Sequence, residues 1–265
     1  MLIGAATAGP SVLWYLARGT GVVALLLLTT SVVLGVLNVR RVSTANLPRF
    51  VVDGLHRSVS LLVLAVLGVH ILASVLDSFV SIGLLAALVP FTAGYRPVWL
   101  GLGAIAFELL VAIAVTSLLR RRIGYRAWRT VHWLAYASWP LAVVHGFGTG
   151  TDGRTGWMLL LTAVCLLAVI AAILARAVAG WPAERPRRVA AGAFAVLSPI
   201  LLVAWLLDGP LASGWARRAG TPVALLAASR AAAAPPAALA LPFTAQVTGR
   251  IAQTSTAAGV VVRIA

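Results

Sequence analysis

Six apolar stretches, each long enough to cross a lipid bilayer, constrain this chain more than any other feature. A transmembrane helix needs about 20 apolar residues at a rise of about 1.5 Å per residue. Because 61% of the 265 residues are hydrophobic, a soluble fold of this length could not bury the apolar surface. We therefore expect an all-α membrane protein, a bundle of six transmembrane helices at about residues 11–39, 55–79, 98–119, 127–147, 156–178 and 189–207.

Arginine placement predicts the orientation of the bundle. The arginines gather after the first, third and fifth apolar stretches, whereas the connections between them hold only Arg96 and Arg154. The arginines after the first stretch are Arg40, Arg41, Arg49 and Arg57; those after the third are Arg120, Arg121, Arg122, Arg126 and Arg129; those after the fifth are Arg176, Arg185, Arg187 and Arg188. By the positive-inside rule these connections face the cytoplasm, which predicts a multi-pass plasma-membrane protein with both termini extracytoplasmic. The net charge of +15 then reflects topology and membrane lipid, and we expect no nucleic-acid partner.

Composition divides the chain into three expected parts. Residues 1–207 form the six-helix transmembrane domain, and within it residues 82–89, followed by Pro90, are too short to cross the membrane. Residues 208–240 are an Ala/Pro-rich linker. Residues 241–265 contain LPFTAQVTGRIAQ and GVVVRIA, which predict two strands of a partial extracytoplasmic β-like segment. Because two strands alone are not stable in water, we expect this tail to be truncated or disordered.

Four histidines lie on two of the predicted helices. His56 and His70 fall on the second helix, and His132 and His145 on the fourth, which runs parallel to it. His56 and His132 are therefore expected near the cytoplasmic side, and His70 and His145 nearer the outside. His56 and His70 are 14 residues apart, which ends about 40° short of four helical turns. His132 and His145 are 13 residues apart, which in a straight helix places them about 140° out of phase. We expect a kink at Pro140 to correct this difference.

The histidine pattern predicts two haem b groups. Neutral imidazole is a good axial ligand for haem iron, and two imidazoles per iron leave no site for oxygen or substrate. A lone membrane histidine is often a helix–helix hydrogen bond, but four paired by helix and depth favour ligands. A zinc or copper path should add carboxylates or thiolates, and neither helix offers one near the histidines. We therefore predict the haem-iron pairs His56/His132 and His70/His145.

The sequence resembles a known family over roughly residues 11–180. The histidine spacings, LARGTG on the first helix and RAWRTVHWLAY on the fourth are similar to the ferric reductase-like transmembrane domain. That family includes ferric reductases, the membrane core of NADPH oxidases and the haem subunit of periplasmic methionine sulfoxide reductase. The resemblance implies that His56 and His132 bind an inner haem and that His70 and His145 bind an outer haem. It also implies that Arg18, in LARGTG, lies near the outer haem.

Charged residues complete the predicted site. Haem propionates favour arginine partners, and Arg57 and Arg129 flank the inner level. Arg18 lies inside the first helix, where a charge is costly without a partner, unless it extends to the outer interface. Glu108 in the third helix is equally costly, so we expect it to pair with Arg18 or to stay protonated. Cys165 is expected to pack in the core or face lipid.

These observations predict a haem-binding membrane subunit of an oxidoreductase that carries electrons across the bilayer. We expect a separate cytoplasmic flavoprotein or quinol as donor and a separate extracytoplasmic acceptor, because no flavin or nicotinamide domain and no catalytic residue is recognised. One alternative is a terminal ferric or oxygen reductase that acts at the outer haem. The other is a non-redox membrane scaffold or transporter.

Overall fold

The computed structural model describes residues 11–40, 48–78, 80, 82–178, 185–233, 251–256 and 259–264. Contacts divide the chain into two units, residues 1–226 and residues 227–265. The long helices of the first unit are α1 (Val12–Val39), α2 (Arg49–Leu76), α4 (Pro97–Leu118), α7 (Gly156–Val178) and α8 (Arg185–Asp208). The shorter elements are α3 (Leu84–Leu88), α5 (Arg120–His132), α6 (Ala135–Thr149), the 3₁₀ helix η1 (Asp152–Arg154), α9 (Trp215–Arg218) and α10 (Val223–Ala233), which runs across the division.

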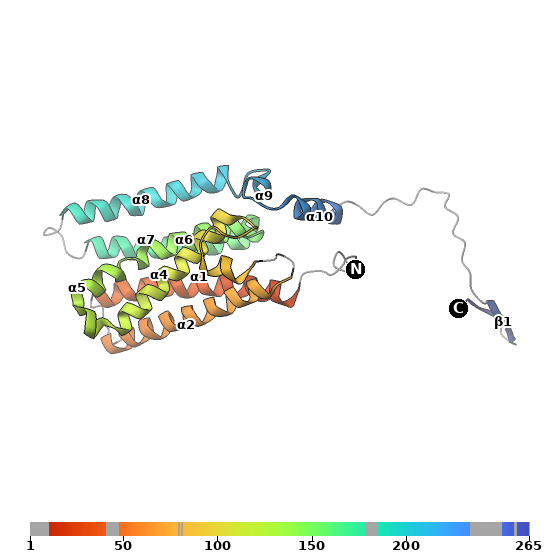
Figure 1. Cartoon of the computed structure of the whole chain (residues 1–265), viewed down its shortest axis with the longest axis horizontal. Coiled ribbons are helices and arrows are strands. Elements are labelled where there is room, and N and C mark those ends of the chain that lie inside the picture. The colour runs from red at the N-terminus through yellow and green to blue at the C-terminus, as the bar shows by residue number, and fades with distance from the viewer. Residues whose placement is uncertain are drawn as a thin grey trace. The chain divides into compact units, whose positions relative to one another are not determined.

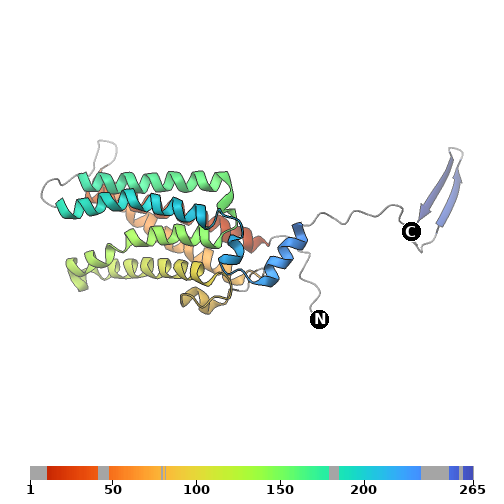
Figure 2. The same cartoon turned by 90° about the horizontal axis from the view of Figure 1, so that it is seen from above.

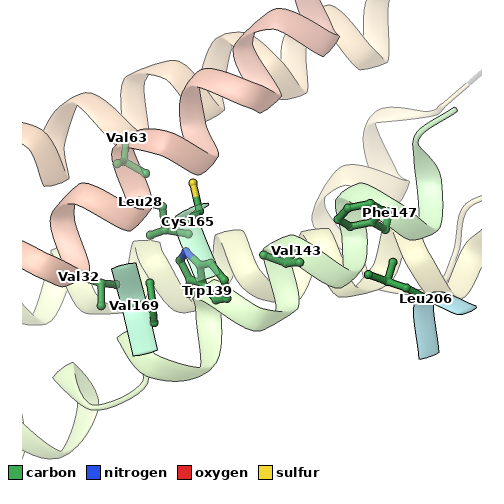
Figure 3. Close-up of a cluster of buried hydrophobic side chains, with 9 residues drawn as sticks. All are labelled: Leu28, Val32, Val63, Trp139, Val143, Phe147, Cys165, Val169 and Leu206. Carbon is green, nitrogen blue, oxygen red and sulfur yellow. The ribbon is translucent and has the colours of Figure 1, made fainter. Parts of the chain in front are cut away.

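The long helices of the first unit form a bundle. They lie side by side, with α5 at one end and α9 at the other (Figures 1 and 2). Helix α1 packs mainly on α2, and α4 on α6, while α7 contacts both α1 and α8. Between them lies a cluster of buried side chains (Figure 3), made of Leu28, Val32, Val63, Trp139, Val143, Phe147, Cys165, Val169 and Leu206. The indole of Trp139 donates a 2.9 Å hydrogen bond to Thr29, which ties α6 to α1 inside this core. The expected packing role of Cys165 is therefore in the core.

The outer surface of the bundle suits lipid. Leucine, valine and isoleucine side chains stand exposed along α2, α7 and α8, as expected for helices that face hydrocarbon and not water. Within the described residues, α1, α2, α4 and most of α7 are long and apolar enough to cross a membrane. In α8 the apolar part is Val196–Asp208, which is too short to be counted with these four helices. The chain is therefore an α-helical membrane protein, but six spans are not confirmed.

The predicted fourth helix is not one continuous helix, and this prediction was wrong. Helix α5 ends at His132 and α6 begins at Ala135, with a turn between them. The N–H groups of Leu134, Tyr136 and Ala137 each donate to a carbonyl three residues back, at 2.9, 3.1 and 2.9 Å. Such 3₁₀ bonds wind the chain by about 120° per residue, against about 100° in an α-helix. Residues 133–137 together add about 100° of rotation, most of the missing phase, while Pro140 lies inside α6.

The remaining predictions concern short segments and the tail. Helix α3 has five residues and cannot span a bilayer, as its sequence predicts. In the second unit, β1 (Ile251–Thr256) pairs antiparallel with β2 (Gly259–Ile264), so both predicted strands are present in their described parts. The first strand was expected from residue 241, and residues 241–250 lie outside the described residues, as does Arg41. The predicted linker contains α9 and α10, and the three domain boundaries stay a prediction.

Candidate functional site

Two pairs of histidine rings face each other inside the bundle. Helix α2 carries His56 and His70, α5 ends at His132, and α6 carries His145. The ring centres of His56 and His132, the first pair, are 6.3 Å apart at an interplanar angle of 77°. Those of His70 and His145, the second pair, are 6.4 Å apart at 86°. The structure thus brings together the residues that the sequence pairs.

The distance within each pair leaves room for one metal ion between the rings. A metal–imidazole bond is about 2 Å long and a ring nitrogen lies about 1 Å from the ring centre, so two opposed ligand rings have centres about 6 Å apart. Both observed distances meet this value. Among the described residues, no group of three or more His, Cys, Asp or Glu side chains could hold a metal ion. Each pair therefore offers two imidazole side chains to a metal ion, and a metal ion held there would need its remaining ligands from a cofactor.

Hydrogen bonds orient three of the four rings. Each Nδ1 bonds to a backbone carbonyl of a neighbouring helix: His56 to Ser31 at 3.0 Å, His70 to Ala17 at 2.7 Å and His145 to Trp99 at 2.9 Å. Because a carbonyl only accepts, Nδ1 carries the proton in each case. Nε2 then keeps the lone pair that a metal ligand needs. Nδ1 of His132 is buried and has no hydrogen-bond partner within the part of the chain that the structure describes.

A glycine lies against each of these three rings. A Cβ added to Gly21 would lie 3.1 Å from the His70 ring, and one on Gly35 would lie 3.2 Å from the His56 ring. A Cβ on Gly103 would overlap the His145 ring. Each glycine follows the accepting carbonyl by four residues, so the missing side chain lets the ring reach that carbonyl. We call these three positions the glycine seats.

The glycine seats were not predicted from the sequence, although a signal for two of them is present. Gly21 and Gly35 are 14 residues apart, the same spacing as the two histidines of α2. In two antiparallel helices, equal spacings keep both contacts in register. A glycine spacing that matches a histidine spacing on the next helix therefore predicts two ring seats.

A large cavity opens beside the second pair. Its volume is about 730 Å³, and its lining includes His70, His145, Gly21, Gly103 and Phe107. Sites for small molecules and cofactors commonly measure about 300–1,000 Å³ and are mostly apolar. The cavity therefore has the size and lining for a large apolar cofactor held between the two rings.

Arg18 lies at the same cavity, but its partner differs from one that the sequence suggested. Its guanidinium forms an ion pair with Asp152, donates to the hydroxyl of Thr151, and lies 3.6 Å over the Trp14 ring. Arg18 and Asp152 both line the cavity. The ion pair of Arg18 is with Asp152, so the first of the two alternatives for Glu108, pairing with Arg18, was wrong; Glu108 is exposed on α4. A propionate contact for Arg18 stays a prediction.

The other two predicted arginines lie near the first pair in sequence. Arg57 follows His56 on α2, and Arg129 precedes His132 by one turn of α5; both side chains are exposed. Their role as propionate partners stays a prediction.

Arg96 is a structural residue that the sequence did not single out. It is buried, has a left-handed backbone with φ of 43°, and precedes α4 directly. Its guanidinium donates to the carbonyls of Gly148 and Thr149 at 2.9 and 3.1 Å, and to the Thr221 hydroxyl at 2.9 Å. Burial lowers the pKa of this guanidinium, yet arginine stays charged in proteins. A cation at the carboxyl end of α6 is favourable, and it fixes α6 to the start of α4 near the second pair.

Comparison with known proteins identifies one family. Residues 20–143 match the family described as ferric reductase like transmembrane component. The matched region contains three of the four histidines and all three glycine seats, and it ends two residues before His145. Comparisons with curated proteins and with solved structures find no match.

Proposed function

We propose that this chain, in which residues 20–143 form a ferric reductase-like transmembrane domain, carries electrons across a membrane through two bis-histidine b-type haems. The family supports transmembrane electron transfer in general, and its domains generally bind haem. The observation that carries the finer proposal is the pair of ring distances, 6.3 and 6.4 Å. Both fit an iron held between two imidazoles.

The histidines determine what such a site can do. At the second pair, both rings offer Nε2 because both Nδ1 atoms donate to carbonyls. A haem iron held by both imidazoles of a pair would have no free position for oxygen or another small ligand. Such an iron would supply a one-electron couple. The chain would hold the two imidazoles in place and leave no site for a substrate at the iron, which suits electron transfer better than a reaction at the metal.

Two levels extend the path across the apolar layer. The histidines of α2 are 14 residues apart, which corresponds to about 21 Å along the helix. Charge transfer over the whole hydrocarbon core, about 30 Å, requires more than one carrier site. The lining of the cavity beside the second pair is mostly apolar, and the ion pair of Arg18 and Asp152 lies in it. Haems held by the two pairs would therefore divide the electron-transfer distance across the bilayer into shorter steps.

The positive-inside pattern supports a direction for this path. It places the first pair near the cytoplasm, where a flavoprotein or a membrane quinol would donate electrons. It places the second pair near the outside, where a separate acceptor would receive them. On this proposal the chain is the haem-binding membrane subunit of an oxidoreductase in the plasma membrane, with both termini outside.

Electron transfer across a sealed vesicle tests the proposal. The purified full chain is placed in liposomes that contain ferricyanide, and dithionite is added outside. We expect the trapped ferricyanide to be reduced much faster than in vesicles without protein. We expect His70→Ala to remove this difference, and the control Gly68→Ala to keep it, because nothing lies within 4 Å of a Cβ at that position. Wild-type vesicles no faster than empty ones would contradict the proposal and favour a scaffold or transporter.

A further inference from the structure

The four histidines are not held in the same way. Three of them donate Nδ1 to a carbonyl beside a glycine seat. The fourth, His132, has a buried Nδ1 without a partner among the described residues. Because no hydrogen bond of Nδ1 orients the His132 ring among the described residues, its orientation depends on other contacts.

Helix α4 has no glycine seat at the level of His132. On this continuous helix a step of 13 residues is about 140° out of phase, and a step of 14 ends about 40° short of four turns. From the seat Gly103 these steps lead to Thr116 and Ser117. The two hydroxyls donate to the carbonyls of Ala112 and Ile113 at 2.7 and 2.6 Å. Both positions therefore have a side chain in place of a glycine, and that side chain bonds to the carbonyl four residues back.

An aromatic ring takes over the contact with His132. The Trp128 ring stacks on the His132 ring, with centres 4.9 Å apart and planes 29° apart. Trp128 is itself fixed: its indole N–H donates to Ser117 at 3.1 Å, and the Arg120 guanidinium lies 4.3 Å from its ring centre. Ser117 belongs to α4, so a chain of contacts runs from α4 through Trp128 to His132.

We propose that Trp128 is the positioning residue of His132, in the role that a backbone carbonyl has for the other three histidines. This inference rests on the proposed function, because it concerns a ligand of the first-level haem. It makes the two levels different: the second level has two hydrogen-bonded imidazoles, and the first level has one hydrogen-bonded and one stacked imidazole. Because a Nδ1–H bond to a carbonyl raises the basicity of a ligand imidazole, the imidazoles at the two levels would differ in basicity toward the irons that they hold.

Spectroscopy of the haem-loaded full chain tests the inference. The electron paramagnetic resonance signal of a low-spin ferric haem depends on the angle between its two imidazole planes, and potentiometry reports ligand basicity. We expect Trp128→Leu to shift the first-level signal and its midpoint potential, and to leave the second-level signal in place. Trp128→Phe keeps an aromatic ring to stack but loses the indole N–H, so we expect it to shift the first-level signal less than Trp128→Leu, by about as much as the loss of the bond to Ser117 alone. The two signals are assigned with His70→Ala, which removes the second.

Two further variants separate orientation from packing. Trp133→Leu is the matched control, because Trp133 is next to His132 but is 48% exposed; we expect no change in either signal. Ser117→Ala removes the hydrogen bond that fixes Trp128, together with the bond from the Ser117 hydroxyl to the Ile113 carbonyl within α4, and it keeps the stacked ring, so we expect a smaller shift in the same direction as for Trp128→Leu. If Trp128→Leu does not fold, the Ser117→Ala result decides alone, and an unchanged first-level signal overturns the inference.

Other outcomes also decide against the inference. Unchanged signals in Trp128→Leu would show that the stack does not orient His132. If Trp128→Leu and Trp128→Phe each change the signals of both levels by the same amount, Trp128 only packs and does not position His132. A wild-type protein without any haem signal would instead contradict the proposed function itself, so the two failures are distinguishable.

Discussion

Replacing Gly103 by alanine tests whether the glycine seats determine cofactor binding. The added Cβ would overlap the His145 ring, which cannot simply move away because its Nδ1 is bonded to the Trp99 carbonyl and the residue lies inside the bundle. Either the ring moves and its hydrogen bond breaks, or helices α4 and α6 separate. Both outcomes displace one ligand of the second pair.

The size of the effect follows from three terms. Overpacking a well-packed site costs about 1–3 kcal/mol. Loss of the hydrogen bond between His145 and the Trp99 carbonyl costs about 1 kcal/mol. Alanine is a better helix former than glycine, which offsets about 1 kcal/mol. The net cost is about 1–3 kcal/mol, and at about 1.4 kcal/mol per factor of ten the second-level haem should bind roughly 5- to 150-fold more weakly.

The assay is haem content per purified chain, with the low-spin signals recorded for each level. We expect Gly103→Ala to lose the second-level signal first, and Gly21→Ala to show a milder loss because its Cβ would lie 3.1 Å from the His70 ring. Gly68→Ala is the matched control, since a Cβ at that position meets open space and Gly68 does not line the cavity. Full haem content in Gly103→Ala, with a second-level signal like that of the wild type, would refute the reasoning.

Three further predictions concern charged residues. Arg96→Ala should destabilise the bundle by about 2–4 kcal/mol, because the carbonyls of Gly148 and Thr149 lose their charged hydrogen-bond donor. An unchanged thermal midpoint would contradict this. Arg18→Gln should keep two haems but lower the second-level midpoint potential, because a positive charge at that cavity favours the reduced iron; an equal potential would place Arg18 away from the cofactor. Glu108→Leu should keep the thermal midpoint unchanged or raise it, because a carboxylate exposed on an apolar membrane helix is costly. Loss of electron transfer in this variant would instead indicate that Glu108 transfers protons.

The pairing of the histidines could be predicted from the sequence because it depends on simple geometry. Two parallel helices with ligands at both ends place His56 beside His132 and His70 beside His145, whatever the details of packing. The spacing of 13 could not be explained in this way. The sequence indicated Pro140, but the extra rotation comes from the 3₁₀ turn at residues 133–137, for which no residue pattern gives a signal.

Contacts between segments distant in sequence escaped prediction for a physical reason. Arg18 was expected to need a partner, but several acidic side chains were available, and only the fold brings Asp152 to it across 134 positions. Arg96 was counted as one arginine of a sparse connection, because its burial depends on how α4 and α6 meet. Burial and long-range pairing are properties of packing, and local periodicity does not encode them.

The most direct measurement of the central claim is the haem content of the purified full chain, with the visible spectrum of its dithionite-reduced form. The structure places two imidazole pairs at ring distances suited to one iron each, so we expect about two b-type haems per chain, both six-coordinate and low-spin. His70→Ala and His56→Ala should each reduce the content to about one haem. A colourless wild-type protein, or one whose haem binds carbon monoxide at once, would contradict the account.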